Sequence, residues 1–398
     1  LFQGEGNFIV DERLDLLDLG TDELGSLLSS WGEPKFRVAQ IQQWLYRELV
    51  DSFEVMTNLP RGLRERLANE TRIGGLVPVS RVESRDRLTD KTLFKLDDGE
   101  TIETVLMLYA DAPDSPELAE GEDRAGKFKR RTLCISTQVG CPIGCPFCAT
   151  GQAGYVRNLT GGEIVAQVLH FAREARKLVP EGHIPITNIV IMGMGEPLMK
   201  FEITLRALQA LIDPARFGLG ARRITVSTSG LIPGIQQLSE TDLQVNLAVS
   251  LHAADDDLRD RLVPINRKYP LGELMSACRD YVQKTHRRVT FEYALMEGVN
   301  DRAEQAQALA KLLRGLLCHV NLIPLNPTAD SDYHRPAYGR VKEFERLLDE
   351  AGIPTTMRVE KGIEIAAGCG QLRQESIKAD KIKGSEAMGD PALRERRN

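Results

Sequence analysis

The stretch Cys141-Pro-Ile-Gly-Cys145-Pro-Phe-Cys148 places three thiols within eight residues. Thiolates are soft ligands that suit iron–sulfur clusters, and such clusters usually take four cysteines. A compact set of three therefore indicates a cluster whose fourth iron is open to another ligand. Two prolines and a glycine between the thiols are typical of a loop, which disfavours three inert cysteines in a core helix or strand.

A zinc site is the alternative for the same cysteines. Structural zinc prefers four ligands, commonly arranged as two separated pairs. No second C-x-x-C or H-x-H pair follows Cys148. The spacing therefore favours iron–sulfur chemistry and leaves zinc as the competing interpretation.

From residue 131 onward, apolar strands alternate with amphipathic helices, which is typical of a parallel sheet. We expect strands at 131–138, 186–193, 223–229, 245–252, 289–296 and 320–326. We expect helices at 161–178, 201–212, 271–284, 302–317 and 340–351. The fold class is therefore α/β, with six strands where a closed barrel has eight. The cysteine loop follows the first strand, at the end of the sheet where such folds bind ligands.

The chain before this repeat has a different pattern. Leu-rich periodic segments predict a small helical module with helices at 22–31, 38–49 and 63–68. Two apolar runs at 91–96 and 103–108 flank Asp98-Gly99, a dipeptide that suits a tight turn, and predict a β-hairpin. The acidic stretch at 111–129 predicts a linker.

Length and composition bound the class of protein. The 398 residues suffice for one large domain and a smaller one, since charged (27%) and hydrophobic (42%) contents are ordinary for a globular chain. The sequence has no apolar run of about 18 residues and no secretory signal, so we expect a cytoplasmic protein without a membrane partner. In that reducing compartment, the seven cysteines are thiols rather than a disulfide framework.

The net charge of −6 does not by itself indicate a nucleic-acid-binding protein, because phosphate contacts need Lys and Arg at the contact surface. Each short basic cluster alone is typical of a solvated face. Together they could assemble an RNA surface from residues 127–131, Arg222-Arg223, Arg267-Lys268 and Arg287-Arg288.

Small or polar residues also end several predicted strands. A glycine there lets backbone approach a ligand, and a carboxylate can accept hydrogen bonds from an ammonium group. These residues are Gly195 and Glu196 after the second strand, Ser227 after the third, Ser250, Leu251 and His252 after the fourth, and Asn326 after the sixth. Each alone is typical of a turn or cap, but together they indicate one polar rim.

The arrangement C-x3-C-x-aromatic-C after the first strand resembles the radical S-adenosylmethionine (SAM) superfamily. The resemblance implies a partial (β/α)6 barrel in which Cys141, Cys145 and Cys148 bind a 4Fe–4S cluster. The open iron would bind SAM, and reduction would split SAM to give a 5′-deoxyadenosyl radical. The polar rim would then contact SAM, and Phe147 would pack near its adenine.

Within the superfamily, four further segments are similar to the adenosine C2 methyltransferases of 23S ribosomal RNA and transfer RNA. They are Thr132–Cys141, Met192-Gly-Met-Gly-Glu-Pro197, Pro264-Ile-Asn-Arg-Lys-Tyr269 and Cys369-Gly-Gln-Leu372. This resemblance implies that Cys369 carries a methyl group, that Cys134 is its resolving partner, and that Glu103 is the proton acceptor. We expect Glu103 to be partly buried, which would raise its pKa toward that of a useful base.

The implied chemistry uses two SAM molecules per turnover. Adenine C2 cannot attack a SAM methyl directly, so one SAM methylates Cys369 and a second supplies the radical. The methyl carbon then joins C2 in a covalent protein–RNA adduct. Cys134 releases the product and forms a disulfide with Cys369, which must be reduced. The implied partners are 23S rRNA and tRNA, in which the target adenine leaves its stack, and an external electron donor of the flavodoxin or ferredoxin type. We expect a monomer.

On this basis we expect four parts of the chain: an N-terminal helical RNA-binding domain (1–80), a β-hairpin extension and linker (81–130), the barrel (131–375) and a charged tail (376–398). Two departures from the family pattern are a longer connection after Tyr109 and Gly368 in place of an alanine. Cys278 and Cys318 match no family role. The alternatives are a methyltransferase that acts on adenine C8 and a non-catalytic, zinc-stapled RNA-binding protein.

Overall fold

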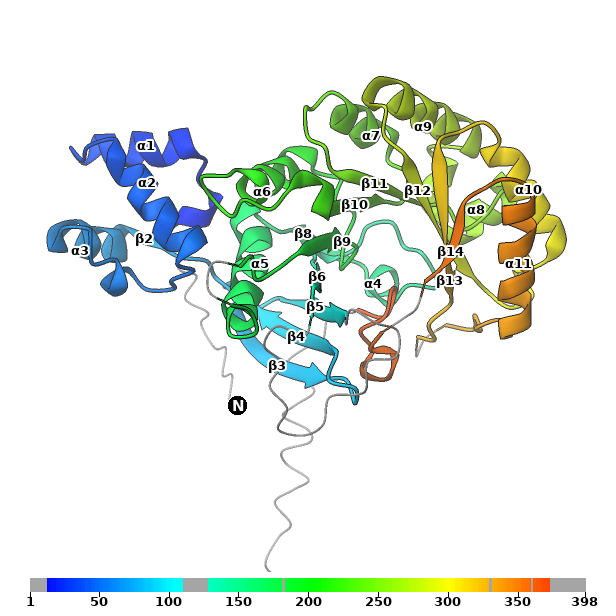
Figure 1. Cartoon of the computed structure of the whole chain (residues 1–398), viewed down its shortest axis with the longest axis horizontal. Coiled ribbons are helices and arrows are strands. Elements are labelled where there is room, and N and C mark those ends of the chain that lie inside the picture. Colours follow the sequence, from blue (N-terminus) through cyan, green and yellow to red (C-terminus); the bar gives the residue numbers. More distant parts are fainter. Residues whose placement is uncertain (1–12, 110–127, 181–182, 329–330, 359–360, 373–398) are drawn as a thin grey trace, which may run out of the picture.

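A computed structural model describes residues 13–109, 128–180, 183–328, 331–358 and 361–372 (Figure 1). The charged tail lies outside these residues, as does nearly all of the expected linker. None of the described helices is long and apolar enough to cross a membrane.

One ten-stranded sheet, ordered β14-β13-β12-β11-β10-β9-β6-β5-β4-β3, forms the centre of the molecule. Its parallel part contains the six predicted strands and one more, which confirms the α/β class. The parallel strands are β6 (Arg130–Cys134), β9 (Asn188–Ile191), β10 (Ile224–Thr228), β11 (Asn246–Ser250), β12 (Val289–Leu295), β13 (Cys318–Pro324) and β14 (Thr355–Met357).

Two features of this sheet differ from the prediction. β14 was not predicted, because its three residues are too few to show a period, yet they pair with β13. The first strand ends at Cys134 rather than at residue 138, since the Thr137 and Gln138 amides both donate to Met194 O. The chain thereby leaves the sheet and forms a ribbon of β7 (Gln138–Gly140) with β8 (Tyr155–Asn158) on either side of the cysteine loop.

Helices cover the outer face of the parallel strands (Figure 1). They are α5 (Gly161–Arg176), α6 (Phe201–Ile212), α7 (Ile232–Ser239), α8 (Asp256–Leu262), α9 (Leu271–Thr285), α10 (Ala303–Leu313) and α11 (Tyr338–Glu350). The short α7 and α8 were not predicted. A capping box starts α5, because Thr160 Oγ1 accepts from the Glu163 amide and Glu163 Oε2 accepts from the Thr160 amide. The prediction for α10 runs four residues too far: Gly315 (φ +75°) turns the chain before residue 317.

The predicted hairpin is present as β4 (Thr89–Lys95) and β5 (Thr101–Tyr109), and β3 (Val77–Glu83) adds a third antiparallel strand. Rather than projecting from the barrel, it continues the barrel sheet: β5 pairs with β6, with Val105 opposite Cys134. Because side chains alternate along a strand, Glu103 and Val105 share a face, and that face also carries Cys134.

The N-terminal helical module is formed by α1 (Thr21–Ser30), α2 (Phe36–Gln42) and α3 (Arg61–Glu70), beside α5 and α6 (Figure 1). Partly buried hydrogen bonds attach it to the barrel. Arg173 Nε donates to Leu49 O (2.6 Å), and the Gly162 amide donates to Asp18 Oδ1 (2.6 Å). The module therefore has a fixed position beside the barrel.

Candidate active site

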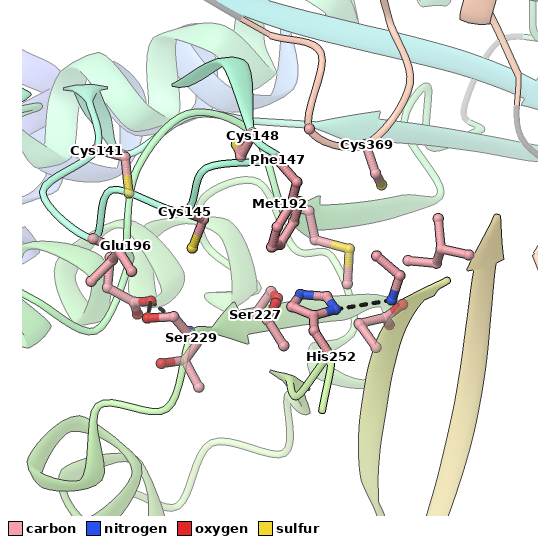
Figure 2. Close-up of a pocket in the computed structure, with 18 of the residues that line it drawn as sticks. Cys141, Cys145, Phe147, Cys148, Met192, Glu196, Ser227, Ser229, His252 and Cys369 are labelled. Carbon is pink, nitrogen blue, oxygen red and sulfur yellow. Dashed lines mark hydrogen bonds between the residues drawn. The ribbon is translucent and has the colours of Figure 1, made fainter. Parts of the chain in front are cut away.

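A cavity of about 160 Å³ lies at the carboxyl ends of the parallel strands (Figure 2). It collects most of the residues predicted from sequence. The predicted residues that line it are Cys141, Cys145, Phe147, Cys148, Gly195, Glu196, Ser227, Ser250, His252, Asn326 and Cys369. Leu251 is completely buried and does not line it, and neither do Cys134 and Glu103.

The cysteine loop takes its shape from glycines. Gly140 has φ +74°, and a Cβ there would lie 2.0 Å from Gly154 O; one at Gly151 would lie 2.8 Å from the Cys145 amide nitrogen. Glycine is thus required at both positions. Burial raises the pKa of Cys141 to about 12 and that of Cys145 well above its usual value, so these thiols need a cation to become thiolates.

Cys369 reaches this cavity because the C-terminal loop docks on the cysteine loop. The Ala149 amide donates to Gly370 O (2.8 Å), and the buried Thr150 hydroxyl donates to Leu372 O (2.5 Å). Asn326 Nδ2 donates to Cys369 O (3.3 Å). Two cysteine-bearing segments more than 200 residues apart in the chain are thereby held together. Asn326 thus has a part in placing Cys369 as well as its expected contact with SAM.

Glu196 is a buried carboxylate, only 2% exposed, that is already extensively bonded. Its Oε2 accepts from the Ser229 amide (2.6 Å) and hydroxyl (2.7 Å), and its Oε1 accepts from the Leu198 amide (3.1 Å) (Figure 2). Burial raises the pKa of Glu196, and these hydrogen bonds act in the opposite direction. Gly195 (φ +111°) is needed beside it, because a Cβ there would lie 2.7 Å from Gln138 Cβ.

His252 is fixed as a neutral ring. Its Nδ1 accepts from the Ala294 amide (2.9 Å), and its ring makes an edge contact with Phe147 at 5.0 Å (Figure 2). Burial lowers the pKa of His252 to about 3. The imidazole therefore supplies shape and a hydrogen-bonding edge to the cavity rather than a charge.

Cys134 and Glu103 lie on the inward face of β6 and β5 and do not line the cavity that holds the clustered cysteines. Burial raises the pKa of Cys134 to about 11, while the charge of Arg358 acts to lower it. Glu103 is more than partly buried, at 2% exposed, and its Oε1 lies 2.7 Å from Lys91 Nζ. Sequence patterns gave no signal of this ion pair, because Lys91 sits across a strand pair rather than nearby in the chain.

A second cavity, of about 860 Å³, occupies the amino end of the barrel. Its lining brings together residues from three of the four basic clusters: Arg130, Arg222, Arg287 and Arg288. Met192, Glu292 and Arg358 line both cavities and form the wall between them. These three residues were not predicted. The alternation along β9 and β12 could have placed Met192 and Glu292 inside, whereas Arg358 follows a strand too short to recognise.

The three clustered cysteines offer thiolates, the ligands that iron–sulfur clusters take. Zinc binds sulfur at about 2.3 Å, so its ligands must meet around one point. Among the described side chains, no group of three His, Cys, Asp or Glu gathers closely enough to hold one metal ion. The described cysteines are thiols rather than disulfides, Cys134 and Cys369 included.

Comparisons with known proteins agree with this site. Residues 135–313 match the model of the radical SAM superfamily, and residues 14–73 match that of the ribosomal RNA large subunit methyltransferase N-terminal domain. A crystal structure of a radical SAM methyltransferase from Sphaerobacter thermophilus superimposes with a TM-score of 0.83 at 51% identity, covering 91% of this chain and 99% of that one.

Curated relatives point to the same family. A probable dual-specificity RNA methyltransferase RlmN from Chloroflexus aurantiacus is 46% identical over 374 residues, covering 91% of this chain and 93% of that protein. One of the same name from Moorella thermoacetica is 46% identical, covering 91% and 97%. The radical SAM barrel is confirmed, and the non-catalytic zinc protein is ruled out because these relatives are enzymes. The chain belongs to the RlmN family of radical SAM RNA methyltransferases.

Proposed function

We propose that this enzyme methylates C2 of an adenosine in 23S rRNA and in tRNA through a methyl-cysteine intermediate. The observation that carries the proposal is the docking of the Cys369 loop on the cysteine loop. Because of it, the Cys369 thiol lines the same cavity as the three clustered cysteines. A radical enzyme that only cleaved SAM would not need that fourth thiol.

Membership in the family implies a 4Fe–4S cluster and SAM, and we assign the cluster to Cys141, Cys145 and Cys148. When bound, the cluster supplies the electron that splits SAM. Gly195, Glu196, Ser227, Ser250, His252 and Asn326 would contact SAM, since they line the same cavity. Leu251 would act only through its backbone, because its side chain lies in the core.

The two remaining thiols divide the methyl transfer between them. The Cys369 thiolate attacks the methyl carbon of a first SAM, so that an S–CH3 bond forms and S-adenosylhomocysteine leaves. A second SAM, held by the residues that line this cavity, would supply the radical chemistry that removes one hydrogen from the methyl group on Cys369. The carbon radical adds to C2. The C2 proton then leaves, one electron passes to an acceptor, for which the cluster oxidised in SAM cleavage would serve, and a methylene bridge joins Cys369 to the adenine.

Cys134 then resolves the adduct. Its thiolate attacks the Cys369 sulfur, the S–CH2 bond breaks toward carbon, and protonation of that carbon gives the methyl product. The resulting Cys134–Cys369 disulfide takes two electrons to return to thiols, while SAM cleavage takes one from an external donor of flavodoxin or ferredoxin type. Glu103 is our candidate base for the C2 proton. Its support is the face it shares with Cys134, and it must exchange its Lys91 partner for the substrate.

We further propose that RNA approaches the amino end of the barrel, where the arginines of the second cavity can bind phosphates. The N-terminal module would be the accessory RNA-binding domain, since its position beside the barrel is fixed. A single copy of the chain holds all these residues, and we propose that it acts as a monomer.

The experiment is reconstitution under anaerobic conditions with SAM, a reducing system and RNA, followed by mass spectrometry of the nucleosides. We expect 2-methyladenosine in both rRNA and tRNA, and a methyl group on Cys369 when RNA is omitted. Detection of only 8-methyladenosine would replace the proposed reaction by the C8 alternative. Protein that retains stoichiometric zinc and no iron would contradict the cluster assignment.

A further inference from the structure

One buried cation beside the site has no part in the chemistry above. Arg259, in α8, has a completely buried side chain (0% exposed). Moving a charged group out of water costs several kcal/mol unless other groups compensate for it. A guanidinium at this depth therefore needs both hydrogen-bond acceptors and a source of negative charge.

The acceptors are backbone carbonyls at the ends of two neighbouring strands. Nη2 of Arg259 donates to Ser229 O (2.7 Å) and Ser250 O (3.1 Å), and Nε donates to Leu251 O (3.1 Å). Gly230, at φ +110°, permits this approach, because a Cβ there would lie 3.2 Å from Nη2. The Arg259 side chain thus joins the ends of β10 and β11. The β10 end bonds Glu196 through Ser229, and the β11 end carries Ser250.

Negative charge is less directly available to Arg259. Its Nη1 donates to the neutral Asn266 Oδ1 (2.8 Å), and only the Asn266 Nδ2 group reaches the carboxylates of Asp256 (2.9 Å) and Asp260 (2.7 Å). Within the described part of the chain, no ion pair joins Arg259 directly to a carboxylate. Two carboxylates therefore act on it across an intervening amide.

The clustered cysteines provide the other source of negative charge. Ser229 and Ser250, whose carbonyls Arg259 bonds, line the same cavity as Cys145, so Arg259 lies just behind the wall of that cavity. Cysteines that bind metal do so as thiolates, so the loaded cavity would add negative charge to that of Glu196, across the strand ends that Arg259 bonds. Burial lowers the pKa of Arg259 to about 10, which leaves it protonated at neutral pH.

We propose that Arg259 is a positioning residue with two effects: it fixes the β10 and β11 ends that form the SAM rim, and it is the buried counter-charge of the cluster. This inference rests on the proposed binding of the cluster by Cys141, Cys145 and Cys148. Reduction adds one negative charge to the cluster, and a nearby buried cation stabilises that form. Arg259 thereby raises the reduction potential and eases electron entry from the external donor.

The test compares Arg259→Gln with Arg259→Lys in protein reconstituted with iron and sulfide. The readouts are the midpoint potential of the cluster, followed by electron paramagnetic resonance, and the equilibrium affinity for SAM. Arg259→Gln should shift the potential to more negative values, and Arg259→Lys should leave it near the wild-type value. Both should bind SAM more weakly, because Gln has one NH2 group and the single Lys Nζ cannot occupy the separate Nε, Nη1 and Nη2 positions of Arg259.

Asp260→Asn keeps the hydrogen bond to Asn266 and removes a negative charge, so it should shift the reduction potential to more positive values. This variant tests the counter-charge role if Arg259→Gln does not fold. Arg61→Gln, on an exposed helix of the N-terminal module, controls for net charge and should shift nothing. Unchanged potentials in Arg259→Gln and Asp260→Asn would overturn the counter-charge role, and unchanged SAM affinity in both Arg259 variants would overturn the positioning role. Wild-type protein that binds no cluster would instead refute the proposed site itself.

Discussion

The docking of the Cys369 loop gives a prediction whose size follows from one hydrogen bond. Thr150→Val keeps the shape of the buried side chain and removes the hydroxyl that donates to Leu372 O. The carbonyl is then unsatisfied when the loop is docked but hydrated when it is not. Leaving one buried acceptor unpaired costs about 1–3 kcal/mol, which corresponds to an undocking equilibrium about 5- to 150-fold more favourable.

Amide hydrogen exchange at Ala149 measures this equilibrium, because that amide donates to Gly370 O across the docked interface. We expect its exchange in Thr150→Val to accelerate by about 5- to 150-fold. Exchange in the central strands should be unchanged, and methylation of Cys369 by SAM should be slower. Thr150→Ser retains the hydroxyl and should resemble the wild type. An Ala149 exchange rate in Thr150→Val equal to that of Thr150→Ser would refute the account of docking.

Three other predictions concern the thiols, the buried histidine and the basic cavity. Cys134→Ala should accumulate a covalent protein–RNA adduct, visible as a shifted band on a denaturing gel; turnover without that band would contradict the resolving role. His252 has a pKa of about 3 when folded and an ordinary value of 6.5, so the folded state binds fewer protons and stability falls as pH drops below 6.5. The free energy of unfolding should fall by about 2 kcal/mol between pH 7 and pH 5. Urea denaturation should show a smaller fall in His252→Asn than in the wild type, and an equal fall would contradict this account. Arg288→Gln, an exposed change in the second cavity, should weaken RNA binding. It should also reduce the slope of log K against log salt concentration by about 0.7–0.9 per lost phosphate contact, whereas Arg61→Gln should change neither.

The parts of the site that sequence predicts are those that are local in the chain. Cys141, Cys145 and Cys148 lie within one loop, so their spacing alone indicates their chemistry. The rim residues follow apolar strands, and parallel strands bring their carboxyl ends to one edge of the sheet. For these residues, the order of the chain and the rules of the fold suffice.

The residues that sequence could not place depend on partners far along the chain or on burial. The Lys91 contact of Glu103 arises from a strand pairing, and the role of Thr150 arises from a carbonyl 222 residues away. Arg259 stands in the stretch Asp255-Asp-Asp-Leu-Arg-Asp260, which has the composition of a solvated helix face. Only the packing of α8 against the β10 and β11 ends turns that charge inward.

The two cavities of the barrel offer a reason why the two cysteines of the proposed methyl transfer lie apart. Along the inner face of β6, Arg130 and Thr132 line the basic cavity, and Cys134 is the next residue in that row. Cys369 lines the opposite cavity, where SAM would bind. An adenine that enters through the basic cavity would therefore meet Cys134 first. Cys369 lies beyond the wall formed by Met192, Glu292 and Arg358. In the proposed mechanism, Cys134 must reach the Cys369 sulfur to release the adduct, so we expect the wall to move as the adduct forms, and the disulfide would link the two cavities until it is reduced.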